Sequence, residues 1–274
     1  MADFSEFIPE VRFEKIPIRS LVSNQTYQRN LSLSHIRKTA TNFNVYQINP
    51  VKVSRCDAVN YVFNGQHTIE IVAAVSGSRE TPVWCMVYED MEYTKEAVIF
   101  ANQQKFVMPL NPHEIFTASI EAGNDQQIII KQLVESYELQ VSCNRGPNRI
   151  CVVSTVEFIC EKHGLNVLDH TLCLYIGTWE GESDSLSSAI IKGISLLIVT
   201  YGDALRDDQF IERVGKFPPR EVSRNARERK MGTMGYAEVM LTAYNKRTKY
   251  PLPWFRLHTL RSQGAEAGNT GLNK

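Results

Sequence analysis

Residues 64–68 read Asn-Gly-Gln-His-Thr, which places two amides, an imidazole and a hydroxyl around one glycine. The apolar residues before them and the helical spacing of apolar residues after them predict a strand, a positive-φ turn and a helix. That helix should begin within residues 66–68 and end at Gly77. Such an elbow directs backbone N–H groups and the positive end of a helix toward one point, which suits a phosphate. The alternative is a tight connection with His67 on the surface.

A second group of chemically active residues lies near the C-terminus. Residues 216–274 hold 12 Lys/Arg and 4 Asp/Glu, a balance of +8, whereas residues 1–215 hold 18 and 26. The spacing of Arg220, Arg224 and Arg227 predicts that they share one helical face. A nucleic-acid surface and an ordinary solvated helix both remain open. The predicted nucleic-acid-binding residues are Arg220, Arg224, Arg227, Arg229 and Lys230.

Other catalytic patterns are absent from the sequence. It contains no Walker-type loop, no H-E-x-x-H helix and no clear Ser-His-Asp set. The six cysteines form no C-x-x-C pair, so we expect buried, reduced thiols. No metal site is predicted, because Asp57 is better explained as a hairpin-loop residue and Glu70 as a solvated helix position than as Mg²⁺ ligands.

Three short boxes resemble those of one protein superfamily. Residues 64–70 resemble the Asp-Gly-Gln-His-Arg-Leu-Glu box of ParB-like proteins, which is itself similar to the Gly-Glu-Arg-Arg box of chromosome-partition ParB. Residues 27–29, Tyr-Gln-Arg, resemble the first box of the superfamily, and residues 102–105, Asn-Gln-Gln-Lys, resemble its Glu-Asn-x-x-Arg box. The resemblance covers about residues 10–120 and implies a ParB/sulfiredoxin-like domain. The relatives that we expect are ParB-like proteins of bacterial mobile elements.

The resemblance implies a pocket for a nucleotide or for a nucleic-acid phosphate. The residues assigned to it are Arg29, Asn64, Gly65, Gln66, His67, Thr68 and Asn102. The implied cofactor is a nucleoside triphosphate with Mg²⁺, and the implied partner is DNA. A homo-oligomer is left open as a further state.

Three departures from the family pattern affect activity. Thr68 stands where these boxes usually carry Arg, so a guanidinium clamp on phosphate is missing there. Ala101 replaces the Glu of the third box, and Gln66 stands where sulfiredoxin needs its reactive Cys. We therefore expect a DNA-associated accessory protein that binds without hydrolysis. A phosphoryl-transfer hydrolase (nuclease or NTPase) and a protein-interaction scaffold with a vestigial pocket are the alternatives.

The composition bounds these interpretations. The chain has 274 residues, 43% of them hydrophobic, and no net charge, which suits one large domain or two of ordinary size. No stretch approaches the ~20 apolar residues of a transmembrane helix. The N-terminal residues lack the charged and apolar regions of a signal peptide. We expect a cytoplasmic protein that makes no membrane contact.

The predicted fold class is α+β. Residues 10–110 should form the ParB-like domain with a small mixed sheet, residues 111–262 an all-helical C-terminal region, and residues 263–274 a disordered tail. The expected strands span 13–18, 49–53, 60–63 and 82–88, with a polar loop over 54–59. The expected helices span 33–41, 66–77, 94–104, 111–123, 125–137, 154–163, 169–179, 186–201, 207–214, 218–230 and 235–246. We expect Leu33, Val98 and Ile129 to face inward, Asn111 and Glu114 to form a capping box, and Ser154 to be an N-cap. Residues 142–149 should be a surface loop, and residues 190–199 the central helix of the bundle.

Overall fold

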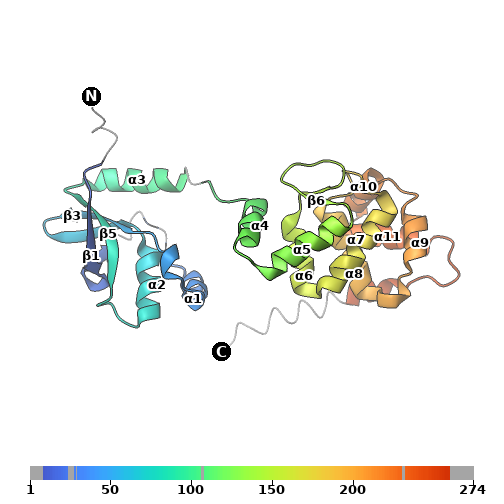
Figure 1. Ribbon diagram of the computed structural model, residues 1–274, viewed down its shortest axis with the longest axis horizontal. Coiled ribbons are helices and arrows are strands. Elements are labelled where there is room, and N and C mark those ends of the chain that lie inside the picture. The colour runs from blue at the N-terminus through green and yellow to red at the C-terminus, as the bar shows by residue number, and fades with distance from the viewer. Residues whose placement is uncertain (1–8, 24–27, 29, 106–107, 230–231, 260–274) are drawn as a thin grey trace, which may run out of the picture. The chain divides into compact units, whose positions relative to one another are not determined.

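The computed structural model describes residues 9–23, 28, 30–105, 108–229 and 232–259. The chain divides into two compact units, Met1–Pro109 (unit 1) and Leu110–Lys274 (unit 2). Unit 1 is mixed α/β and unit 2 is almost wholly helical, so the predicted α+β class is confirmed (Figure 1). Within the described ranges, none of the helices has the length and apolar character needed to cross a bilayer. The predicted tail, 263–274, lies outside the described residues.

Unit 1 is built on a five-stranded mixed sheet in the order β1-β5-β3-β4-β2. The strands are β1 (Arg12–Pro17), β2 (Leu21–Ser23), β3 (Val51–Cys56), β4 (Val59–Asn64) and β5 (Pro82–Glu89). The β1/β5 and β3/β4 pairs are antiparallel, whereas β3/β5 and β2/β4 are parallel. This topology puts β3 at the centre of the sheet, and β4 lies beside it with its end at the elbow.

The described residues of unit 1 also form three α-helices: α1 (Leu33–Thr41), which packs against α2, α2 (Gln66–Ser76) and α3 (Tyr93–Lys105). Ile69 and Val72 of α2 are buried in one cluster with Val53 and Val62 of the central strands. The helix α2 therefore lies against the sheet (Figure 1), and this packing fixes the position of its N-terminus at the end of β4.

Several details of unit 1 differ from the sequence predictions. The predicted loop over 54–59 shrinks to Asp57 and Ala58, because both residues take left-handed φ angles of 49° and 62° that join twisted strands tightly. Leu33 and Val98, expected to face inward, are exposed to 66% and 58%. In α3 it is Glu96 that is buried, so this helix is rotated relative to the predicted inner face.

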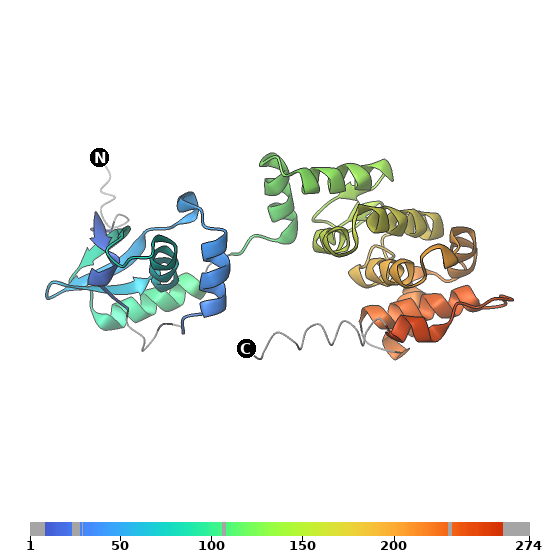
Figure 2. The ribbon, with the colours of Figure 1, turned by 90° about the horizontal axis from the view of Figure 1, so that it is seen from below.

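Unit 2 is a helical bundle with one short pair of strands. Its helices are α4 (Pro112–Glu121), α5 (Asp125–Ser136), α6 (Val153–His163), α7 (Leu165–Trp179), α8 (Ser188–Tyr201), α9 (Asp207–Val214), α10 (Pro219–Arg229) and α11 (Thr233–Asn245). The strands β6 (Gln140–Val141) and β7 (Arg149–Ile150) pair in parallel and were not predicted. Figure 2 shows the helices as successive layers, from α4 and α5 in green to α10 and α11 in orange and red.

The apolar helix α8 is the centre of the bundle, as predicted from residues 190–199. It packs against α6, α7 and α11. Gly193 permits the close approach of α11, because a Cβ atom at this position would lie 2.7 Å from Cε of Met240 and 3.1 Å from Cβ of Tyr236. The position of α11 therefore depends on a glycine at the core of the unit.

Some predictions for unit 2 need correction. The inner stripe of α5 is Ile130 and Val134, whereas Ile129, predicted to be inside, is exposed. The N-cap of α6 is Val152 rather than Ser154. The capping box at Asn111 and Glu114 is confirmed. None of the six thiols forms a disulfide, but Cys85 alone among them is buried, so the prediction of burial is wrong for the exposed Cys143 and Cys173.

Candidate functional site

The elbow, residues 64–68, has the predicted strand-turn-helix geometry. Gly65 is the N-cap of α2 and has φ 108°, a conformation that side chains rarely allow. A Cβ atom on Gly65 would also lie 3.2 Å from Cα of Val51. The helix ends at Gly77, whose φ of 69° confirms the predicted left-handed cap. The sequence therefore holds the positive end of α2 at a fixed place beside the sheet.

His67 joins the beginnings of two helices. Its Nε2 accepts a hydrogen bond of 3.2 Å from the backbone N–H of Ser32, which is the N-cap of α1. Its ring also meets the ring of His35 edge to face, with centroids 5.6 Å apart. In the neutral ring an accepting Nε2 leaves the proton on Nδ1. His67 thus acts as a connection between α1 and α2.

Residues of the other two boxes reach the same end of β4. Nδ2 of Asn64 donates a hydrogen bond of 2.7 Å to Oε1 of Gln103. Asn102, which the sequence assigned to this pocket, is exposed instead. The buried Gln28 donates from Nε2 to the carbonyl oxygen of Val62. Parts of all three boxes therefore meet around one strand end. Arg29 lies outside the described residues.

The remaining residues near the elbow have structural partners or lie away from it. Gln66 is buried and Thr68 is half-buried on the first turn of α2. The carboxylate of Glu70 accepts two hydrogen bonds from Arg79, of 3.0 and 3.1 Å, and Asp57 lies in the β3–β4 turn. Across the described ranges, no group of three His, Cys, Asp or Glu side chains is arranged to hold a metal ion.

A polar cavity with a volume of about 1140 Å³ lies in unit 2. Five arginines line it, and we call it the arginine cleft. They are Arg145, Arg149, Arg220, Arg224 and Arg227. The acidic residues of its described lining are Asp184 and Glu228, so arginines exceed carboxylates by three.

Two separate segments supply these arginines. Arg220, Arg224 and Arg227 lie on α10, and their shared face agrees with the spacing of four and three in the sequence. Arg145 and Arg149 come from the segment that leads into β7. The sequence predicted only a surface loop over residues 142–149. Two arginines four residues apart beside Gly-Pro were the signal that could have identified the site.

Most of the cleft's guanidinium groups have no carboxylate partner in the described part of the chain. Arg220 forms an ion pair with Asp184 through its Nε atom. The other four arginines are exposed and form no ion pair with any residue that the structure describes. Each can therefore present several N–H donors to an anion that enters the cleft.

The N-terminus of α8 adds to the positive potential of the cleft. Ser187 caps this helix, since its hydroxyl accepts a 3.2 Å hydrogen bond from the N–H of Ile190, and Ser187 and Ser188 both line the cavity. The pKa of the Cys151 thiol is affected by the same positive charge. Burial raises its pKa, and the positive charge of Arg145 opposes that rise. The cleft thus combines guanidinium groups with the positive end of a helix.

Arg229 belongs to a different surface from the other arginines of α10. Its Nη1 donates to Oγ1 of Thr242 at 2.6 Å, and its guanidinium lies 5.2 Å from the ring centroid of Trp254. It therefore does not line the arginine cleft with Arg227. Lys230, the fifth residue of the predicted set, lies outside the described residues.

The chain resembles one family and a few solved structures. A family model described as "Family of unknown function (DUF6551)" matches residues 22–254. No curated protein matches the chain. A C-terminally truncated chromosome-partitioning ParB from Caulobacter crescentus, complexed with CTP-gamma-S, is 13% identical, with 85% of this chain and 98% of that chain covered and a TM-score of 0.35. The same protein complexed to the centromeric parS site is 17% identical, covers 78% and 99%, and has a TM-score of 0.28.

Proposed function

The chain belongs to this family of unknown function, DUF6551, whose description assigns no activity, and we propose that it is a nucleic-acid-associated protein that binds phosphate groups. The observation that carries the proposal is the arginine cleft, where four exposed arginines without ion-pair partners in the described ranges surround one cavity. Guanidinium groups bind phosphate oxygens through paired hydrogen bonds. DNA is the proposed partner, because a polyanion can engage several of these groups at once.

The decisive experiment measures binding of a fluorescently labelled 20-base-pair duplex and of its single strand by anisotropy in ~50 mM salt. The test variant replaces Arg149, Arg224 and Arg227 with Gln. Its matched control replaces Arg247, Lys249 and Arg256, which are exposed cations of unit 2 outside the cleft.

The cleft variant should bind at least about tenfold more weakly than the native chain, and the control should bind within about twofold of it, if contacts in the cleft rather than net charge govern affinity. Equal losses of affinity in both variants would show that the cleft contributes no more than ordinary surface charge. A native chain that binds neither nucleic acid would reject the proposal.

A second phosphate site is proposed at the elbow. The positive-φ Gly65 places the N-terminus of α2 beside β4, and the resemblance of three boxes to ParB-like proteins supports a nucleotide as the ligand. A ligand at about 100 times its Kd stabilises the folded state by about 2.7 kcal/mol. Thermal unfolding with each of the four common ribonucleoside triphosphates, with and without Mg²⁺, tests this. No response to any of them would favour the scaffold alternative.

We propose that the elbow binds without turnover. Ala101 lies on α3 where the resembling box carries Glu, so the acid that could position water or metal is missing from that position. The purified chain should release no phosphate above background from a triphosphate. Robust release or DNA cleavage that His67→Ala abolishes would establish the hydrolase alternative instead. The mobile-element setting is a further proposal, which a gene position among relaxase and conjugation genes would support.

A further inference from the structure

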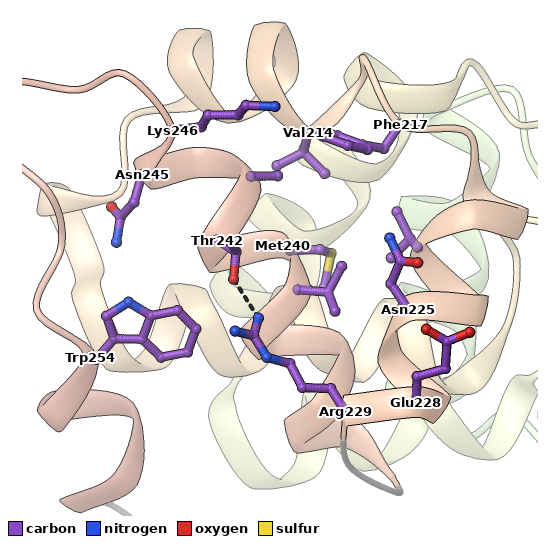
Figure 3. Close-up of a pocket in the computed structure, with 13 residues that line it drawn as sticks. Val214, Phe217, Asn225, Glu228, Arg229, Met240, Thr242, Asn245, Lys246 and Trp254 are labelled. Atoms are coloured by element: carbon purple, nitrogen blue, oxygen red, sulfur yellow. Dashed lines mark hydrogen bonds between the residues drawn. The ribbon is translucent and has the colours of Figure 1, made fainter.

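Unit 2 has a second cavity, of about 690 Å³, whose lining differs from that of the arginine cleft (Figure 3). It lies among the end of α9, the inner side of α10, the C-terminal half of α11 and Trp254. Val214, Val222 and Met240 form an apolar floor, and all three are buried. A cavity of this size with an apolar floor and a few polar groups is typical of sites for small molecules.

Two cations lie at the edge of this cavity, each over an aromatic ring. Nζ of Lys246 is 5.8 Å from the ring centroid of Phe217, and the guanidinium of Arg229 is 5.2 Å from that of Trp254. Arg229 is also held by its hydrogen bond to Thr242 and by an ion pair with Glu238, with 4.0 Å between Nε and Oε2. Lys246 is exposed and forms no ion pair within the described part of the chain. Its ammonium group can therefore approach an anion without losing an ion pair.

We propose that this cavity binds a small molecule with a flat apolar body and a single anionic group. The body would replace water over Met240 and Val222 and lie beside the Phe217 and Trp254 rings, which favour flat ligands. The anionic group would lie at Lys246, because this cation has no ion pair with a described residue, whereas Arg229 is already paired with Glu238. A nucleic-acid backbone does not suit this site, because its charged phosphates would be desolvated over the apolar floor.

The site is independent of the proposed nucleic-acid function, because the two cavities use different residues of α10 and share only Glu228 in their described lining. Val222 and Asn225 line the apolar cavity, whereas Arg224 and Arg227 line the arginine cleft. Substitutions at Asn225 or Lys246 leave the arginines of the cleft in place. Failure of one proposal therefore leaves the other standing.

The test is calorimetric titration of the full chain with naphthalene-2-sulfonate and with 2-naphthylmethylammonium, which has a similar body and the opposite charge. The sulfonate should bind and the ammonium should bind at least about tenfold more weakly, since charged hydrogen bonds carry the difference. Lys246→Gln should weaken sulfonate binding by about tenfold. The matched control, Lys249→Gln, removes an exposed lysine outside the cavity and should bind as the native chain does.

Two further variants locate the ligand. Asn225→Trp places a bulky side chain in the cavity from a half-buried position on α10 and should abolish binding while the circular dichroism spectrum stays native. Bound sulfonate should change the emission of Trp254, so Trp254→Phe should lose that spectral change but keep the heat of binding. No binding to the native chain, equal affinity for the two ions, equal effects of Lys246→Gln and Lys249→Gln, or native binding by Asn225→Trp would each overturn the proposal.

Discussion

The arginines of the cleft in unit 2 differ from Arg55 and Arg79 of unit 1 in the partners that they have. In unit 1, Arg55 donates to both carboxylate oxygens of Glu14 at 3.0 and 2.6 Å, and Arg79 donates to both oxygens of Glu70 at 3.0 and 3.1 Å. In the arginine cleft of unit 2, four of the five arginines form no ion pair with a described residue. Paired guanidinium groups hold the fold together, whereas exposed and unpaired ones keep their donors for an external anion.

The elbow and the arginine cleft also differ in whether their side chains already have partners. At the elbow, the side chains of Asn64 and His67 have hydrogen-bond partners within unit 1, so phosphate recognition there depends on the backbone at Gly65 and on the end of α2. In the cleft, recognition depends on flexible side chains around an open cavity. We therefore expect the elbow to be sensitive to backbone geometry and the cleft to be sensitive to salt.

The largest expected effect concerns the salt dependence of the cleft. If three or four phosphates are neutralised, the slope of about −0.9 per phosphate predicts that duplex affinity falls about 40- to 150-fold between 50 and 200 mM salt. Replacing Arg149, Arg224 and Arg227 with Gln should flatten this dependence to a few-fold change. Anisotropy titrations at four salt concentrations measure both slopes. An unchanged slope in the variant would show that the unpaired arginines of the cleft do not bind the phosphates of the duplex.

The next effect concerns the backbone at the elbow. Gly65→Val forces a β-branched residue to φ 108° and brings Cβ to 3.2 Å from Val51, so unit 1 should lose about 1–3 kcal/mol of stability from backbone strain. The variant should also lose any stabilisation by nucleotide. Urea unfolding and thermal shift measure the two effects.

Gly77→Asn is the matched control for this substitution, because Gly77 ends the same helix at φ 69° with no atom within 4 Å of an added Cβ. Asn tolerates the left-handed conformation, so this variant should keep both stability and nucleotide response. Gly65→Val protein that stays as stable as the native chain would show that the elbow geometry is not required.

The sequence predicted the parts of these sites whose residues are close together in the chain, and it missed the parts whose residues are far apart. The elbow was predicted because strand, glycine and helix are neighbours in the chain, and the shared face of Arg220, Arg224 and Arg227 followed from helical spacing. Arg145 and Arg149 could not be assigned, because the fold of unit 2 brings segments about 75 residues apart to one cavity, which no local pattern encodes.

Helix rotation limited the prediction of the third box. Adjacent residues on a helix point about 100° apart, so an error of one residue in the expected inner face of α3 exchanges one side chain for the next. Asn102 was chosen because it matched the box, yet Gln103 makes the contact with Asn64. An error in the expected inner face of α3 likewise explains why Val98 was expected inside where Glu96 is buried.

A smaller effect concerns access to the cleft. Cys143 is exposed and lines the cleft, whereas Cys173 is exposed elsewhere in unit 2. With duplex at about ten times its Kd, about a tenth of the sites stay free, so iodoacetamide should modify Cys143 about tenfold more slowly. The rate at Cys173 should not change, and mass spectrometry of each peptide measures both. Equal rates at Cys143 with and without duplex would place the nucleic acid outside the cleft.

The rate at which iodoacetamide modifies Cys85 can be measured in the same experiment. Burial raises the pKa of its thiol to about 11, so little thiolate forms near neutral pH. It should react far more slowly than Cys143 whether duplex is present or not. Rapid modification of Cys85 would mean that unit 1 opens under the labelling conditions, and the rates would then have to be measured at lower temperature.

The smallest expected effect concerns a paired arginine of unit 1. The hydrogen bond from Arg55 lowers the pKa of Glu14, so the folded-state pKa lies below the unfolded one. The pair therefore adds its full stability above the unfolded value of about 4.5, and this stability is lost as the pH falls through the lower folded pKa. With side chains 25% and 34% exposed, the contribution should be about 0.5–1 kcal/mol.

Glu14→Gln should accordingly speed amide exchange of β1 and β5 at pH 7 and have no effect at a pH below the folded pKa. The matched control is Glu80→Gln, because the Arg19–Glu80 pair is as short, at 2.7 Å, but its side chains are 64% and 62% exposed. Solvent screens that pair, so the control should leave exchange unchanged at both pH values. If the two variants behave alike at pH 7, then pairing in unit 1 contributes no more than surface charge does, and the unpaired state of the cleft arginines no longer distinguishes a binding site from an ordinary surface.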